Sequence, residues 1–195
     1  MSTTEHPIAG LSFATEDTYL HATDRAVAEA TETLLAVEVA HETYGIATAA
    51  VREIIKVGEI TEVPRMPRFL LGVISVRGVI IPVLDLRRRL GFAAAEPGRA
   101  ARIVIVTVGE DRFGLRVDDV LGLERFRASE VEPAPAIFGS GRAGPERHIQ
   151  GVGRAIERPD RIVIFLDLSP LAALAEELAA FRTKRRRASD EDEEA

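Results

Sequence analysis

Few residues of this 195-residue chain have the types and spacing that chemistry requires. Two aspartates, Asp85 and Asp167, open similar D-L segments, and two carboxylates of this kind are what an acid protease needs for its catalytic pair. Each one precedes an expected helix, however, where capping the first turn is the simpler role. A two-barrel hydrolase therefore stays an alternative, and it requires that the two carboxylates share a cleft.

Other catalytic patterns lack the context that they need. The run Gly139–Gly144 matches G-x-G-x-x-G, but no strand precedes it and Pro145 follows it, so a linker is favoured over a dinucleotide site. Ser140 lies among these glycines without an assignable His–Asp pair. The chain has no Cys, and its histidines are scattered: His6, His21, His41 and His148. We expect no enzyme, no cofactor and no metal.

Charge and hydropathy argue against a nucleic-acid-binding, secreted or membrane-spanning protein. Residues 1–32 hold one Arg against six carboxylates, and residues 182–195 hold five basic and five acidic side chains. The body, 33–181, is nearly neutral with 19 basic and 20 acidic residues, which disfavours nucleic acid as a partner. Neither a signal peptide nor an apolar run long enough to span a membrane is present, so we expect a cytoplasmic protein without membrane insertion.

Short apolar runs broken by Gly, Pro and acidic residues predict a strand-rich fold. The expected strands are Leu34–Ala40, Tyr44–Thr48, Val51–Val57, Leu71–Val76, Val79–Leu84, Ile103–Val108, Arg112–Val117, Leu121–Phe126, Ile149–Ala155 and Arg161–Leu166. Two helices are expected, Leu86–Leu90 with Asp85 as N-cap and Gly91 as stop, and Pro170–Phe181 after an N-cap at Ser169. The predicted class is all-β.

An internal repeat indicates how these strands are organised. Shifted by 69 residues, LLAVEVAHETYGI (34–46) lies on IVIVTVGEDRFGL (103–115) without a gap. Gly72-Val73 also matches Gly151-Val152, and Val83–Leu86 matches Phe165–Leu168. We infer a duplicated unit of about 60 residues with roughly five strands, enough for a small barrel. The predicted barrels cover about 34–91 and 103–168.

The segment Leu71–Leu84 predicts a hairpin that is apolar on both faces. A strand pair with one solvated face would alternate with polar residues. The outer face therefore packs on the other barrel or meets a partner. Arg77-Gly78 forms the expected tip, where Gly supplies the positive φ of a tight turn. Arg77 has no obvious partner within the chain, and an isolated guanidinium suits recognition of a carboxylate.

These residues resemble a known family. The stretch YGIATAAVREIIKV (44–57), the block GVISVRGVIIPVLDLRRRLG (72–91) and GLRVDDV (114–120) closely resemble the CheW-like domain of bacterial chemosensory systems. The resemblance implies a domain over 33–181 with two tandem five-stranded SH3-like barrels. It also implies a non-enzymatic adaptor that couples methyl-accepting receptors to the regulatory domain of a CheA-type histidine kinase.

The resemblance also implies two binding surfaces. The kinase-binding residues would be Val51, Glu53, Ile54 and Gly72. The receptor-binding residues would lie in a groove between the barrels: Arg77, Gly78, Val117, Val120 and Leu123. Ordinary core positions are an equally good explanation for Val51 and Ile54.

Two departures from the family pattern remain. Ser75-Val76 stands where the family usually has Asn-Leu before Arg-Gly, which leaves receptor choice open. The acidic leader 1–32 and the charged tail 182–195 are not part of the pattern, and we expect both to be disordered. These departures motivate an alternative function, a stand-alone regulator that sequesters the kinase in a non-chemotactic pathway.

Overall fold

The computed structural model describes residues 30–134 and 147–171, which are mostly β-strand. The elements in chain order are β1 (Thr31–Val39), β2 (Glu42–Ala47), β3 (Val51–Lys56), β4 (Leu70–Val76), β5 (Val79–Asp85), α2 (Leu86–Arg89), β6 (Arg102–Val108), β7 (Asp111–Val117), β8 (Asp119–Arg127), the 3₁₀ turn η1 (Ala128–Glu130), β9 (Glu132–Pro133), β10 (Ile149–Arg154) and β11 (Ile162–Leu166). The all-β prediction is confirmed, and every expected strand is present with ends shifted by a few residues. No helix in this part of the chain has the length and apolarity of a membrane span.

Some predictions fall outside the described residues. They concern the glycine run Gly139–Gly144, most of the expected helix 170–181, the tail 182–195 and most of the leader. The leader was expected to extend to residue 32, but β1 begins at Thr31, so its last residues belong to a strand.

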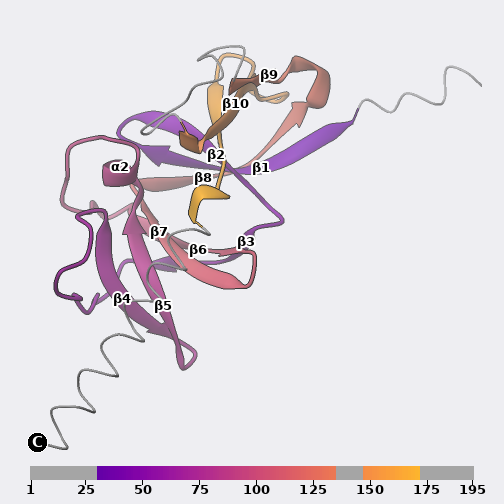
Figure 1. The fold of residues 1–195 in the computed structure, drawn as a ribbon. Helices are drawn as coiled ribbons and strands as arrows, with labels where there is room; N and C mark the ends of the chain where they lie inside the picture. The colour runs from indigo at the N-terminus through magenta and orange to yellow at the C-terminus, as the bar shows by residue number, and fades with distance from the viewer. Residues whose placement is uncertain (1–29, 135–146, 172–195) are drawn as a thin grey trace, which may run out of the picture. The chain divides into compact units, whose positions relative to one another are not determined.

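The strands form two sheets (Figure 1). Sheet A has the order β8-β1-β2-β11-β10-β9, and sheet B has the order β3-β6-β7-β5-β4. Among the described strands, the first and last strands of each sheet are not hydrogen-bonded to each other, so neither sheet is a closed barrel. Two sheets are therefore confirmed, whereas closed barrels are not formed by strand pairing.

Each sheet combines the first hairpin of one repeat with the remaining strands of the other. The hairpin β1–β2 pairs with β8 and β11, and the equivalent hairpin β6–β7 pairs with β3 and β5. This exchange corrects the predicted barrel limits of 34–91 and 103–168, which assigned strands by their order along the chain. Because both repeats carry the same apolar pattern, the pattern identifies equivalent strands but not the copy with which each pairs.

Three apolar clusters form the core, and one of them joins the two sheets. The inter-sheet cluster takes side chains from both sheets and from α2: Leu35, Val37, Val39, Tyr44, Ile46, Leu70, Leu84, Leu86, Leu90, Val104, Val106, Phe113, Leu115, Val117, Leu166 and Leu171. Smaller clusters lie on the other faces, around Phe126 and Phe165 in sheet A and around Ile81 and Ile105 in sheet B. Successive residues of a strand point to opposite faces, so strands buried on both faces are apolar throughout.

The short helix α2 begins as the sequence predicted. Asp85 is the N-cap, and its Oδ1 accepts a hydrogen bond from the Arg87 backbone N at 3.1 Å. Gly91 follows the helix with φ of 87°, a conformation that favours glycine. These two residues mark the two ends of α2.

Candidate functional site

Glu53 and Arg77, which were predicted for two different partners, form an ion pair. Arg77 Nη2 lies 3.2 Å from Glu53 Oε2. This contact corrects the expectation that Arg77 has no partner within the chain. The Arg77 side chain is nevertheless 84% exposed. An exposed pair of this kind contributes about 0–1 kcal/mol to stability, so its guanidinium can exchange Glu53 for a group on another protein at little cost.

A tight turn between β4 and β5 positions Arg77. Arg77 has φ of 50° and Gly78 has φ of 81°, and positive φ at both central residues is what a type I′ hairpin turn requires. The expectation for Gly78 is therefore confirmed. The left-handed conformation costs a residue with a Cβ about 1 kcal/mol, so the backbone alone disfavours Arg at position 77.

The edge strand β3 positions the predicted kinase-binding residues. A register shift between Val51 and Glu53 bends β3 against β6. Ile54 is 42% exposed, whereas Val51 is partly buried against the inter-sheet cluster. The core explanation therefore fits Val51 and fails for Ile54, which leaves Glu53 and Ile54 as the accessible residues among the kinase contacts predicted on β3.

Gly72, also predicted to bind the kinase, has a backbone role. Its φ is 145°, and a Cβ at this position would lie 2.2 Å from the Thr61 carbonyl oxygen. Thr61 and Val73 exchange two backbone hydrogen bonds of 2.9 Å beside it. Gly72 is buried and permits this close approach, so it shapes β4 without offering a side chain to a partner.

The predicted receptor-binding residues divide between the two sheets. Arg77 and Gly78 lie at a turn of sheet B, whereas Leu123 is on β8 of sheet A and is 65% exposed. Leu123 is paired with Leu35, a member of the inter-sheet cluster, and residues paired in this way share a face of the sheet. Leu123 therefore lies at the rim of the space between the sheets.

The other two predicted receptor contacts are less accessible. Val117 is 1% exposed within the inter-sheet cluster, and Val120 is partly buried against it. Val117 cannot touch a partner in this conformation. The prediction of Val117 as a contact is corrected to a packing role beneath the rim, because only side chains at the surface reach another protein.

The hairpin β4–β5 is buried at its base and exposed near its tip. At its base, Leu70 and Leu84 pack into the inter-sheet cluster. Near its tip, Val79 is exposed and Ile80 is 62% exposed. Ile54 follows Glu53 on β3, and Val79 and Ile80 follow the turn that carries Arg77. We call these five exposed or partly exposed residues, Glu53, Ile54, Arg77, Val79 and Ile80, the tip patch.

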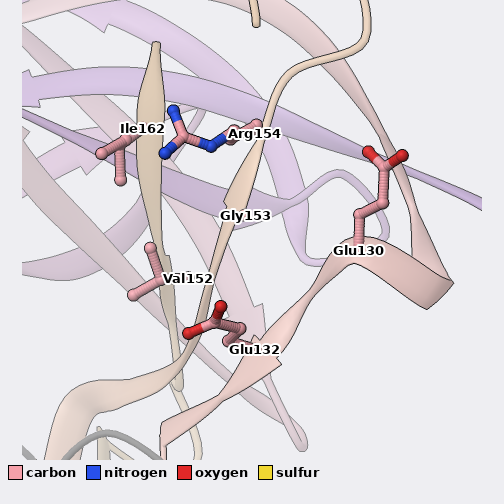
Figure 2. A pocket seen from close by; sticks show the side chains of 6 residues that line it. All are labelled: Glu130, Glu132, Val152, Gly153, Arg154 and Ile162. Carbon is pink, nitrogen blue, oxygen red and sulfur yellow. The ribbon is translucent and has the colours of Figure 1, made fainter. Parts of the chain in front are cut away.

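A second exposed region was not predicted. A cavity of about 460 Å³ opens at the β9–β10 edge of sheet A (Figure 2), and its lining residues are Glu130, Glu132, Val152, Gly153, Arg154 and Ile162. Ile162 is 51% exposed and pairs with Arg154, just as Ile80 pairs with Ser75. The match of Val83–Leu86 to Phe165–Leu168, continued three residues toward the N-terminus, places Ile80 on Ile162. This alignment was the sequence signal from which the exposed position of Ile162 could have been predicted.

The geometry removes the hydrolase alternative. Asp85 is buried, caps α2 and forms ion pairs with Arg116 at 2.7 Å and Arg88 at 3.1 Å. Asp167 Oδ1 instead accepts hydrogen bonds from the backbone N and Oγ of Ser169, at 2.9 and 2.6 Å. The two carboxylates are therefore held in separate local contacts, Asp85 at the start of α2 and Asp167 in a short turn with Ser169.

The described histidines form no metal site. Within 30–134 and 147–171, no group of three or more His, Cys, Asp or Glu residues is arranged to hold a metal ion. His41 lies at the exposed β1–β2 turn, and His148 is buried. Burial, together with the nearby charge of Arg89, lowers the pKa of His148 to about 4. His148 is therefore a neutral packed side chain near pH 7.

Comparisons with known proteins agree with these features. A family model described as the CheW-like domain matches residues 33–176. Protein FrzA from Myxococcus xanthus is 34% identical over 138 residues, which cover 71% of this chain and 83% of FrzA. Chemotaxis protein CheW from Rhizobium meliloti is 35% identical over 104 residues, which cover 53% of this chain and 67% of that protein.

A solved structure shares the fold. The crystal structure of scaffolding protein TtCheW from Thermoanaerobacter tengcongensis superimposes with a TM-score of 0.63 and 29% identity, covering 71% of this chain and 90% of that one. The family match spans most of the chain and includes the stretches 44–57 and 72–91 that carried the resemblance. The chain therefore belongs to the CheW-like domain family.

Proposed function

We propose that this chain is a cytoplasmic, non-enzymatic adaptor that couples methyl-accepting chemoreceptors to the regulatory domain of a CheA-type histidine kinase. Family membership supports the class, because the relatives include chemotaxis proteins and a scaffolding protein. The observation that carries the proposal is the tip patch, in which exposed Ile54, Val79 and Ile80 accompany an exposed ion pair. Exposed apolar side chains with a polar rim are typical of surfaces that bind proteins.

The kinase surface is proposed at Glu53 and Ile54. Ile54 offers apolar area that is removed from water only when a partner covers it. Glu53 beside it supplies a carboxylate whose present partner is a highly exposed guanidinium. Val51 and Gly72 support this surface from below, through packing on the inter-sheet cluster and through the close approach to Thr61.

The receptor surface is proposed at Arg77 and Leu123, one on each sheet. A helical receptor segment that carries carboxylates would satisfy Arg77 by a charge-assisted hydrogen bond. Leu123 would be covered at the rim of the inter-sheet space. Gly78 fixes the turn that presents Arg77, and Val117 and Val120 form the packed floor.

The alternative of a kinase-sequestering regulator is not favoured. The curated relatives include chemotaxis proteins from Rhizobium meliloti and Bacillus subtilis, at 35% and 36% identity. A coupling role also uses two surfaces, whereas sequestration needs only the one that binds the kinase. Assembled receptor–kinase complexes distinguish the two, because a coupling protein raises kinase activity and a sequestering protein lowers it with dose.

The direct test is calorimetric titration with the kinase regulatory domain and, separately, with the receptor tip. Ile54→Glu is expected to weaken kinase binding about tenfold or more, by placing a charge in the apolar contact. Arg112→Glu, an exposed change on β7, is the matched control and should bind like the wild type. Equal kinase binding by Ile54→Glu and the wild type would contradict the proposed surface.

A further inference from the structure

A basic and aromatic pocket beside α2 is not used by the proposed function. The pocket has a volume of about 470 Å³, and its lining residues are Arg68, Phe69, Arg88, Gly91, Phe92 and Ala94. It lies where the segment before β4 meets the segment that follows α2. Its size is within the range of natural binding pockets, and its walls combine two phenyl rings with two guanidinium groups.

Packing and hydrogen bonds hold the pocket walls in place. Phe69 and Phe92 both pack against the inter-sheet cluster. Arg88 Nη1 donates to the Arg68 carbonyl oxygen at 2.7 Å, and Arg88 Nε pairs with the buried Asp85 carboxylate at 3.1 Å. Arg87 Nε donates to the Ala93 carbonyl oxygen at 3.3 Å. An occupant would therefore meet a preformed surface, which lowers the entropy lost on binding.

The pocket has more positive than negative charge. The guanidinium groups of Arg87, Arg88 and Arg116 share two carboxylates, those of Asp85 and Asp118. Arg68 is exposed, and its guanidinium has no hydrogen-bond or ion-pair partner in 30–134 or 147–171. The Arg68 guanidinium beside the aromatic rings favours a carboxylate-bearing occupant with some apolar contact.

We propose that the pocket binds the acidic run Asp190–Glu194 of the same chain. The last described segment starts near the pocket wall. The Asp167 backbone N donates to the His148 carbonyl oxygen at 2.8 Å. The charge of Arg89 acts on His148, and the Arg89 guanidinium lies 4.5 Å from the centre of the Phe69 ring. The acidic run begins 19 residues after the last described residue and consists of five consecutive carboxylates. A segment of this length can extend to about 60 Å, which is ample for a return to α2.

Tethering makes a weak contact sufficient. A segment on the same chain has an effective concentration of about a millimolar at its site, so a millimolar affinity already gives substantial occupancy. The basic run Arg182–Arg187 has the same sign as the pocket and is repelled from it, which selects the acidic run. Because most of the attraction is between exposed charges, salt weakens it.

The test measures competition between the tail and a peptide added in trans. The probe is a fluorescein-labelled peptide of residues 189–195, and binding is followed by fluorescence anisotropy at low salt. The two proteins are the wild-type chain and a full-length variant with Asp190→Asn, Glu191→Gln, Asp192→Asn, Glu193→Gln and Glu194→Gln. The neutralised variant is expected to bind the peptide about twofold more tightly, because its tail no longer competes for the pocket.

A second change locates the binding site. Arg68→Glu in the neutralised background is expected to abolish peptide binding, and Arg112→Glu, a change at another exposed arginine, on β7, is the matched control. Circular dichroism checks that both variants fold. Equal peptide binding by the wild-type and neutralised chains, an unchanged affinity in Arg68→Glu, or the absence of binding at low salt would each overturn the proposal.

Discussion

Glu53 on β3 and Arg77 at the β4–β5 turn form an ion pair in which Arg77 Nη2 lies 3.2 Å from Glu53 Oε2. The pair connects the two ends of sheet B, because β3 and β4 are the first and last strands of the order β3-β6-β7-β5-β4. The sheet is thus curled so that its two ends approach each other at the tip patch. Charge changes at either residue are expected to act locally, because the pair is exposed and stabilises the fold by about 1 kcal/mol at most.

Charge reversal of Glu53 separates the two proposed surfaces. Glu53→Arg is expected to weaken binding to the kinase regulatory domain about tenfold, because it places a cation where the partner meets an anion. Arg77→Ala should leave kinase binding unchanged and weaken receptor binding. Calorimetry with each partner measures both. The separation is wrong if both variants lose the same partner while circular dichroism shows that both are folded.

Gly72 is expected to be necessary for stability rather than for contact. Gly72→Ala should lower the free energy of unfolding by about 3 kcal/mol, because its φ of 145° is strained for alanine and its Cβ would lie 2.2 Å from the Thr61 oxygen. Gly58→Ala is the control, since a Cβ there meets no atom within 4 Å. Urea denaturation measures both variants. Equal stability of the two would show that Gly72 is not needed for its backbone geometry.

Leu123 and Val117 are expected to respond in opposite ways. Leu123→Ser should weaken receptor binding and leave stability nearly unchanged, because this side chain is 65% exposed. Val117→Ala should lower stability by about 2 kcal/mol, because it opens a cavity in the inter-sheet cluster. Thermal denaturation and receptor titration distinguish the two effects. A stable Val117→Ala variant with impaired receptor binding would restore Val117 as a direct contact.

His148 makes stability depend on pH. Its pKa is about 4 in the folded chain and near 6.5 when unfolded, so the unfolded state takes up the proton first as the pH falls. Stability is therefore complete above pH 6.5 and decreases toward pH 4, by up to about 3 kcal/mol for this group. Protonated His148 would lie near Arg89 and Arg147, with Asp167 as the opposing charge.

The variant His148→Gln tests this dependence. It should flatten the change of unfolding free energy between pH 6.5 and pH 4, as measured by urea denaturation at a series of pH values. The wild-type chain, measured in parallel at each pH, is the reference. A slope in His148→Gln as steep as that of the wild type would assign the dependence to other groups.

Local signals predicted the strands, α2 and the family, but not the partners of the strands. Alternation and turn residues act over a few positions, and Asp85 and Gly91 mark the ends of α2 by cap chemistry. The pairing of β2 with β11 and of β7 with β5 depends on contacts between distant segments of nearly identical pattern. The two-residue strand β9 is too short for any periodicity.

In the candidate site, too, local sequence signals predicted single residues but not contacts between distant segments. Gly78 was predictable because a tight turn demands positive φ, and Ile54 was ambiguous because an apolar residue on a strand suits a core as well as an interface. The Glu53–Arg77 pair joins residues on different strands, so sequence spacing offered no sign of it. The buried state of Val117 depends likewise on the packing of the two sheets.

The most direct measurement is calorimetric titration of the wild-type chain with the regulatory domain of a CheA-type kinase from the same organism. The adaptor role predicts saturable binding with a Kd of tens of micromolar or tighter, weakened about tenfold by Ile54→Glu and unchanged by Arg112→Glu. No binding by the folded wild-type chain at these concentrations would contradict the role.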